Sequence, residues 1–119
     1  MNRKKLIGGK STPKWELILR ELLKERNIEF IPNDRSVLSG GLELDIWIPS
    51  LRIGIELNGI YHYSSKPYKD KNKFEERKKK DLRKAEEMKL LGYRLVIVER
   101  RSVKGNIREF LNTILDEIL

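Results

Sequence analysis

Two neighbouring segments of alternating residues constrain the fold of this chain most strongly. Residues 42–48 and 52–58 each alternate apolar with polar or small positions, and this period of two is typical of β-strands. Only four residues, 49–52, separate Ile48 from Ile53, which is a hairpin-loop length. The pattern predicts two antiparallel strands, each with one core face and one polar face. The expected pairs are Ile48 with Ile53, Ile46 with Ile55, and Leu44 with Leu57.

The same register places Asp45 opposite Glu56 on the polar face of the hairpin. Cross-strand neighbours have Cβ atoms about 5 Å apart, and like charges there destabilise a sheet unless a positive group bridges them. Two carboxylates suit Mg²⁺, which prefers oxygen ligands and commonly acts on phosphates. The alternatives are a solvated sheet face or a nearby Lys or Arg. The acid pair therefore favours metal-assisted phosphate chemistry and leaves these alternatives open.

Composition bounds the partners of such a site. The 119 residues include 26 Lys and Arg against 18 Asp and Glu, for a net charge of +8, which favours a polyanion, with nucleic acid the first candidate. The absence of cysteine excludes disulfide frameworks and zinc–thiolate sites. No apolar run reaches the length of a membrane span, and residues 1–10 lack the apolar stretch of a signal peptide. We expect one cytoplasmic domain over residues 1–119, without membrane association, in which residues 1–10 form a flexible basic N-terminus.

The remaining segments predict helices on either side of a small sheet. Apolar spacing predicts a helix from Pro13 to Arg26 and another over residues 74–91, whose stripe of Leu82, Ala85, Met88 and Leu91 should pack on the sheet. Residues 28–32 and 93–98 read as strands, residues 33–41 as a turn and residues 63–73 as a mobile loop. Residues 107–118 predict an amphipathic helix that either packs on the sheet or binds a partner.

This order of elements, with an Asp on one hairpin strand and a Glu on the next, resembles the PD-(D/E)XK nuclease superfamily. Within it, residues 33–35, 43–49 and 55–62 resemble phage-type endonucleases related to very-short-patch repair (Vsr-like) enzymes, including EDxHD homing endonucleases. The resemblance implies a restriction-endonuclease-like α/β fold with an α-β-β-β-α-β core, a mixed sheet flanked by helices and an extra C-terminal helix. It also implies a Mg²⁺-dependent deoxyribonuclease, with Mn²⁺ as a substitute, encoded by a phage or mobile element.

Matched by position, the resemblance implies catalytic roles for Glu16, Asp45, His62 and Asp81, and Glu56 occupies the variable position between them. The hypothesis that follows makes Asp45 and Glu56 the metal ligands and includes Glu56 and Lys84 among the catalytic residues. The lysine of the broader superfamily pattern falls at Asn58, an uncharged residue, so His62 and Lys84 are the candidates to replace it. Structural alternatives stay open: an ion pair of Glu16 with Arg20, a structural His62, and a solvated helix face for Asp81 and Lys84.

The abundant cations predict contacts with DNA phosphates. Arg35 is expected at the entrance of the site, and the other predicted contacts are Lys66, Lys69, Lys73, Arg77, Lys78 and Lys80. We expect duplex or branched DNA as substrate, nicked by a monomer or cut through both strands by a homodimer. The alternatives are a catalytically decayed nuclease fold that only binds DNA, and a subunit of a larger nucleic-acid complex.

Overall fold

The computed structural model describes residues 12–59 and 71–119. These residues form the helices α1 (Lys14–Glu25), α2 (Lys71–Leu91) and α3 (Ile107–Ile118), the strands β1 (Ile31–Asp34), β2 (Leu44–Ile48), β3 (Ile53–Asn58) and β4 (Arg94–Glu99), and the short 3₁₀ helix η3 (Arg100–Ser102). The strands make one sheet in the order β1-β2-β3-β4. β1, β2 and β3 pair antiparallel and β4 joins β3 in parallel. The predicted mixed α/β fold, with its α-β-β-β-α-β core and C-terminal helix, is confirmed.

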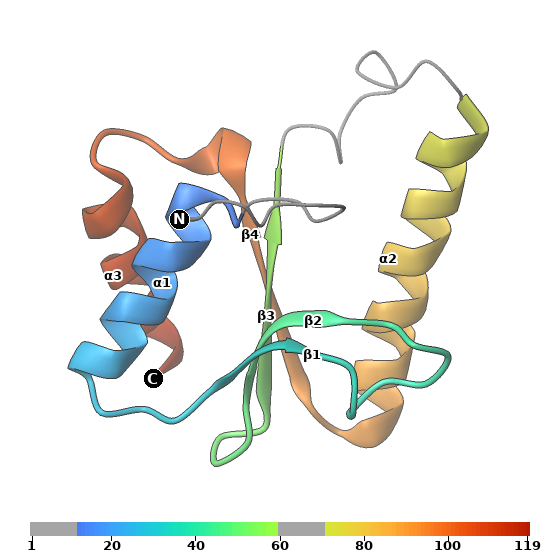
Figure 1. Cartoon of the computed structure of the whole chain (residues 1–119), viewed down its shortest axis with the longest axis horizontal. Helices are drawn as coiled ribbons and strands as arrows, with labels where there is room; N and C mark the ends of the chain where they lie inside the picture. The colour runs from blue at the N-terminus through green and yellow to red at the C-terminus, as the bar shows by residue number, and fades with distance from the viewer. Residues whose placement is uncertain (1–11, 60–70) are drawn as a thin grey trace, which may run out of the picture.

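Helices α1 and α3 cover one face of the sheet and α2 covers the other (Figure 1). The first face buries a core drawn from α1, the three strands β2, β3 and β4, and α3. Leu111 and Leu115 of α3 are completely buried in it, so the apolar side of the C-terminal helix packs inside the molecule. Of the two alternatives for this helix, packing on the sheet is the one the structure adopts.

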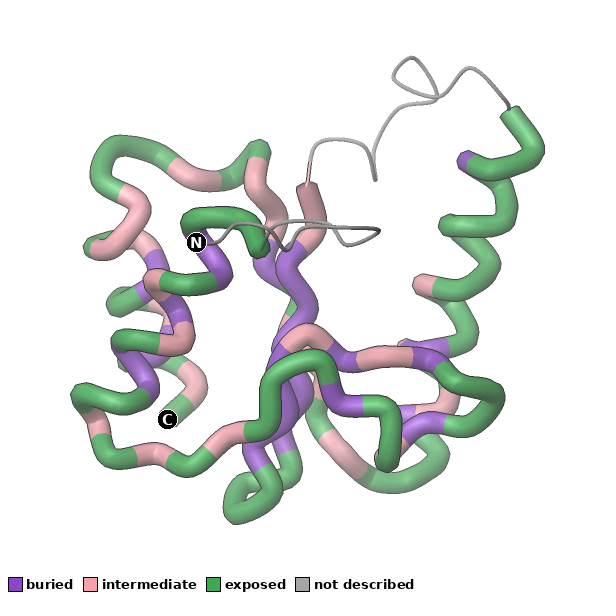
Figure 2. Tube along the Cα trace, viewed as in Figure 1, coloured by how far each residue is buried: buried purple, intermediate pink, exposed green. Residues whose placement is uncertain are grey.

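The opposite face is apolar over part of its length, whereas a polar face was predicted on each strand. A second cluster of Leu38, Leu42, Leu44, Trp47 and Met88 lies between the sheet and α2, and the ring centroids of Trp47 and Tyr93 are 5.1 Å apart. β3 is buried continuously from Ile53 to Leu57, as the central strands in Figure 2 show. Gly54 permits this packing, because a Cβ there would lie 2.9 Å from Met88 Cε and 3.2 Å from Leu44 Cδ1.

Several predicted boundaries are wrong by two or three residues. β1 covers residues 31–34 instead of 28–32, so Asn33 and Asp34 belong to a strand and the turn follows them. The Asp34 carboxylate explains this order, because it accepts hydrogen bonds from the backbone N–H groups of Ser36 and Val37 and so fixes the turn after the strand. β2 begins at Leu44 instead of residue 42. Residues 71–73, predicted as part of a mobile loop, form the first turn of α2, and residues 63–70 lie outside the described residues.

Helix α2 is rotated relative to its predicted apolar stripe. Met88 is buried, but the side chain of Leu82 is 62% exposed and Leu91 is also exposed. Phe74, Lys84 and Met88 form the buried side instead. This orientation of α2 brings Lys84 to Glu56 on β3. The spacing of apolar residues does not predict such a contact between buried opposite charges. None of the described helices is both long and apolar enough to cross a membrane.

Candidate active site

Two carboxylates lie together where strands β2 and β3 stop pairing. Their backbone register includes Ile48 with Ile53 and Ile46 with Ile55, as predicted. One position beyond Ile46 and Ile55, carboxylate oxygens accept the hydrogen bonds of the backbone N–H groups. The N–H of Asp45 donates to Glu56 Oε2 at 2.7 Å, and the N–H of Leu57 donates to Asp45 Oδ2 at 2.8 Å. Each carboxylate is therefore anchored to the backbone of the opposite strand.

The chain changes faces at this point, so the predicted pairing of Leu44 with Leu57 on one core face is wrong. Leu44 packs in the cluster beneath α2, whereas Ile46 and Leu57 pack in the cluster beneath α1 and α3. Strict alternation would put Leu44 and Ile46 on the same face. Leu44 departs from this alternation, and the two acids lie side by side at the end of the β2–β3 ladder.

Lys84 reaches this pair from α2. Its Nζ lies 2.7 Å from Glu56 Oε1, and the two side chains are only 11% and 6% exposed. Glu56 thus accepts a charged hydrogen bond on one oxygen and a backbone hydrogen bond on the other. A nearby lysine was one of the open alternatives for balancing the acid pair, and the structure contains it. The alternative of a solvated helix face for Lys84 is wrong, because its side chain is buried against Glu56.

Burial raises the pKa of both acids. For Glu56 the charge of Asp45 raises the pKa further, while Lys84 lowers it by charge and by hydrogen bonding. For Asp45 the opposing influences are the hydrogen bond from the Leu57 N–H and the charge of Lys84. In both cases the raised pKa means that negative charge is disfavoured. The single ammonium of Lys84 therefore does not offset the cost of ionising both carboxylates.

Glu16 brings a third acid to the same region. It lies in the first turn of α1 and is buried. Burial raises its pKa most and the charge of Asp45 raises it next, whereas Arg20 lowers it. The alternative of an ion pair with Arg20 is also present, at 3.1 Å. Sequence reasoning missed that Arg20 donates in addition to Asn33 Oδ1 on β1, at 3.1 Å, because helical spacing does not show which strand residue faces a helix.

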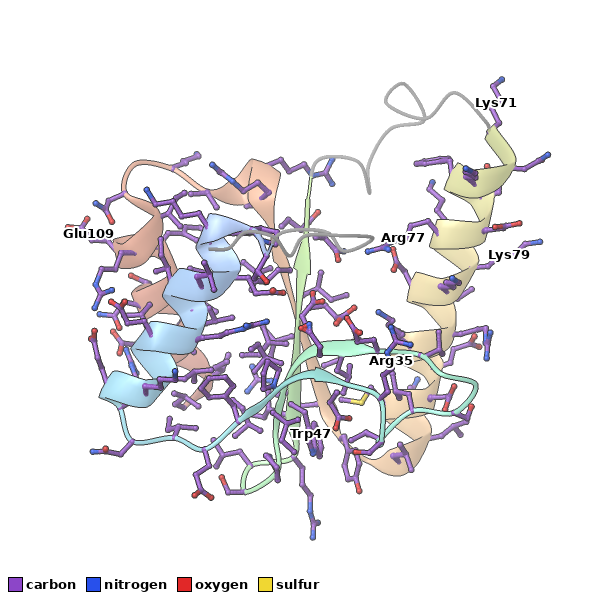
Figure 3. All side chains as sticks on the ribbon, in the orientation of Figure 1. Arg35, Trp47, Lys71, Arg77, Lys79 and Glu109 are labelled. Carbon is purple, nitrogen blue, oxygen red and sulfur yellow. The ribbon has the colours of Figure 1, made fainter. Side chains whose placement is uncertain are left out.

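Asp81 and Lys84 line a small cavity together with Glu56 and Asn58, closed on its other side by Leu95 and Ile97 of β4. Asp81 Oδ1 lies 3.8 Å from Arg77 Nε. The charge of Arg77 also lowers the pKa of Asp45. Figure 3 shows Arg77 directed from α2 toward the sheet and Lys79 directed away from it. The side of α2 that faces the sheet therefore carries the cationic and acidic residues of the site.

The other predicted contacts lie around this centre or outside the described residues. Arg35 is exposed and pairs with Glu43 at 3.1 Å, and the charge of Glu43 raises the pKa of Asp45. Lys73, Lys78 and Lys80 are exposed on α2, and Lys78 Nζ lies 4.9 Å from the centroid of the Phe74 ring. The remaining predicted site residues, His62, Lys66 and Lys69, lie outside the described residues.

The carboxylates of the site suit a hard metal ion as ligands, but they are few. Over residues 12–59 and 71–119, no cluster of three or more Asp, Glu, His or Cys side chains is arranged to hold a metal. The described carboxylates at the end of the β2–β3 ladder are those of Asp45 and Glu56. Carboxylate oxygens are the ligands that Mg²⁺ prefers, and Mg²⁺ usually keeps several water ligands and needs only one or two carboxylates. The two acids are therefore compatible with a magnesium site.

Comparison with known proteins finds similarity at the level of structure. No family model matches the chain, and no curated protein matches its sequence. Among solved structures, the chain is similar to the catalytic domain of the homing endonuclease I-Bth0305I, with 25% sequence identity and a TM-score of 0.50. The similarity covers 89% of this chain and 87% of that one. The arrangement described above is thus similar, over most of both chains, to a nuclease catalytic domain.

Proposed function

We propose that this protein is a metal-dependent endonuclease that hydrolyses DNA phosphodiester bonds. One observation carries the proposal. At the end of the paired part of β2 and β3, the carboxylates of Asp45 and Glu56 accept backbone N–H groups of the opposite strand, and Lys84 bonds to Glu56. The similarity to a homing endonuclease catalytic domain supports the same chemistry. The resemblance to phage-type, Vsr-like and EDxHD endonucleases is part of this proposal.

Asp45 and Glu56 would hold Mg²⁺, with Mn²⁺ as a substitute. Their raised pKa values support this assignment, because a divalent cation offsets the repulsion between two carboxylates that burial already makes costly. When bound, the ion would polarise a phosphate oxygen and lower the pKa of a coordinated water.

The other residues of the site would position and balance charge. Lys84 fixes Glu56 through the bond to Oε1, and its positive charge would help to stabilise a phosphate beside the acid pair. Arg20 fixes Glu16, the third acid of the region. Asp81 lies on the cavity wall beside Lys84. His62 follows from the resemblance alone, and its proposed role is general base or stabilisation of the transition state.

DNA is the substrate that the surface charge favours. The sequence has a net charge of +8, and Arg35, Lys73, Lys78 and Lys80 are exposed around the site. Cations of this kind bind the phosphate backbone and position a duplex or branched DNA without reading its sequence.

Cleavage of supercoiled plasmid tests the proposal. Purified protein is incubated with plasmid in Mg²⁺, Mn²⁺ or EDTA, beside the variants Asp45→Asn and Asp116→Asn. Asp116 is the matched control, because it is an exposed acid on α3 that pairs with Arg26. We expect nicked or linear DNA with either metal, none in EDTA, loss of cleavage in Asp45→Asn and wild-type cleavage in Asp116→Asn.

A second candidate function is a catalytically decayed nuclease fold that binds DNA. It is favoured by the uncharged Asn58, which stands where the superfamily pattern has lysine, and by the engagement of both Glu56 oxygens with protein donors. DNA that is bound but left uncut in every metal would support this candidate over the nuclease. A protein that neither binds nor cuts DNA would contradict both.

A further inference from the structure

A second group of cations lies immediately after β4, in a segment without an assigned role. Arg100, Arg101 and Lys104 occur within five positions, and we refer to them as the η3 cluster. The side chain of Arg101 is 61% exposed, Lys104 is exposed and Arg100 is partly exposed. Glu99 pairs with Arg101 at 3.1 Å, so the three cations exceed the adjacent acid and leave a positive surface.

The parallel pairing of β3 and β4 brings this cluster to the acid pair. Glu56 pairs with Ile97, and Asn58 pairs with Glu99. Because parallel strands end at the same edge of the sheet, η3 begins beside the carboxyl end of the strand that carries Glu56. The η3 cluster therefore lies at the end of the sheet to which the acid pair belongs.

A contact with α1 fixes the side of the site that the cluster occupies. The guanidinium carbon of Arg100 lies 5.9 Å from the centroid of the Trp15 ring, and Trp15 immediately precedes Glu16 in the first turn of α1. The η3 cluster thus borders the turn that supplies the third acid. Lys73, Lys78 and Lys80 lie on α2, on the opposite side of the sheet (Figure 1).

We propose that the η3 cluster and the exposed cations of α2 contact the phosphates of the two strands of a DNA duplex, one strand on each side of the acid pair. The substrate is then double-stranded where it is cut. The inference rests on the proposed nuclease function and adds the substrate form and a contact surface to it.

The dimensions of DNA favour a duplex over a single strand for this arrangement. The phosphate backbones that border a groove of B-DNA are about 6 Å apart across the minor groove and about 12 Å apart across the major groove. The two basic surfaces lie on opposite faces of the sheet (Figure 1), and a duplex offers a separate strand to each of them. Arginine suits the role, because its planar guanidinium binds phosphate oxygens in pairs. A single strand that runs through the acid pair engages the cations of α2 and does not require η3.

DNA binding without cleavage tests this inference. In EDTA, the affinity of the full chain is measured across a salt series for a labelled duplex and for a single strand of the same sequence. The test variant is Arg101→Gln with Lys104→Gln, which keeps Arg100 on Trp15. The matched control is Arg94→Gln with Lys89→Gln, which removes the same charge from exposed positions at the other end of β4 and at the last turn of α2. A third variant is Lys73→Gln with Lys80→Gln.

We expect the η3 variant to weaken duplex binding and leave single-strand binding unchanged. Loss of two phosphate contacts lowers the slope of log K against log salt by about 1.8, since each contact contributes about 0.9. The α2 variant weakens binding to both DNA forms, and the matched control weakens neither. Equal unfolding temperatures establish that the variants are folded.

Two results overturn the inference while the plasmid test decides the nuclease function separately. If the slope of log K against log salt for the duplex is unchanged in the η3 variant, the cluster does not contact the DNA. An equal loss of single-strand and duplex affinity in that variant shows that the cluster does not distinguish the second strand. If the plasmid is still cut in either case, the proposed function stands without this inference. A wild-type protein that binds neither DNA form and cuts no plasmid in any metal overturns both.

Discussion

At the scale of single residues, Asp45 and Glu56 combine a structural task with the chemical one proposed for them. Each accepts a backbone N–H across the point where the β2–β3 ladder stops, and this satisfies donors that burial would otherwise leave unpaired. The same burial raises the pKa of both carboxyls. The fold therefore holds two acids in fixed positions at a cost in stability that a bound cation would reduce.

The pH dependence of stability follows from these shifts. A raised pKa in the folded state means that the folded protein retains protons that the unfolded chain has released. The stabilisation is complete below the ordinary pKa values of 3.8 for Asp45 and 4.5 for Glu56, and it is lost as pH rises through the raised values. In EDTA, we expect Asp45→Asn to lose less stability than the wild type between pH 4 and pH 7, roughly the range in which carboxyls with raised pKa values ionise. Urea unfolding at each pH measures this, and parallel curves would contradict it.

The ion pair of Lys84 and Glu56 gives a second prediction. Both side chains are nearly inaccessible, so Lys84→Met leaves Glu56 buried without its cation. We expect a loss of about 3 to 5 kcal/mol in the free energy of unfolding. The double variant Lys84→Met, Glu56→Gln should recover part of it, because the glutamine oxygen still accepts the Asp45 N–H. Urea unfolding of the two single variants and the double variant measures the coupling, and additive losses would refute it.

At the scale of elements, sequence periodicity predicted those elements whose position is set by apolar burial. The spacing of Leu19, Leu22 and Leu23 identified α1, and that of Leu111 and Leu115 identified α3, because both helices bury one apolar stripe in the first core. Periodicity misplaced the buried side of α2. There Lys84 faces the sheet because its ammonium bonds to Glu56 of β3. Leu82 is left exposed. A buried ion pair links residues that are distant in sequence, so apolar spacing alone cannot reveal it.

The same distinction applies to the site. Alternation along two strands was enough to place Asp45 opposite Glu56. The interruption that moves Leu44 to the α2 face was not predictable, because it depends on which helix covers each face. Glu16 and Lys84 were predicted from the resemblance and not from spacing, and the link from Arg20 to Asn33 was missed. Sequence spacing therefore predicted the hairpin contacts from Ile48 and Ile53 as far as the acid pair but not beyond it, and it did not predict the contacts between a helix and the sheet.

The interface of α1 and α3 allows apolar packing to be compared with surface charge. Leu111 is completely buried in it, while the half-exposed Arg108 donates to Glu21 at 2.6 Å and also to Glu25. We expect Leu111→Ala to lower the free energy of unfolding by about 2 to 5 kcal/mol. Arg108→Ala should have a much smaller effect, because water and salt screen exposed ion pairs. Urea unfolding at low and high salt tests the comparison, and a larger effect for Arg108→Ala would reverse it.

At the scale of the whole molecule, a metal bound at the acid pair should stabilise the entire fold. A ligand that binds only the folded state adds about 2.7 kcal/mol at a hundredfold excess over its Kd. We expect Mg²⁺ to raise the unfolding temperature of the wild type and not that of Asp45→Asn, with Asp116→Asn behaving like the wild type. Differential scanning calorimetry at constant ionic strength measures the shift. An equal shift in Asp45→Asn would show that the ion acts elsewhere.

The number of sites determines how the proposed nuclease would cut DNA. Over the described residues, the buried acid pair of Asp45 and Glu56 occurs once per chain, whereas a duplex has two strands of opposite direction. One chain bound once can therefore attack only one strand, and a double-strand break requires a second binding event or a second copy related by two-fold symmetry. We expect nicked circles to accumulate before linear plasmid, and linear product to depend more steeply on protein concentration than nicking does.

A plasmid time course at several protein concentrations, beside sedimentation of the protein alone and with a short duplex, measures both quantities. Linear DNA that forms without a nicked intermediate, at a rate proportional to protein concentration, would require a preformed dimer with two acid pairs facing opposite strands. Sedimentation would then detect that dimer in the absence of DNA. A monomer that yields nicked circles first instead matches the single acid pair, with the η3 cluster and α2 on either side of one cleavage position.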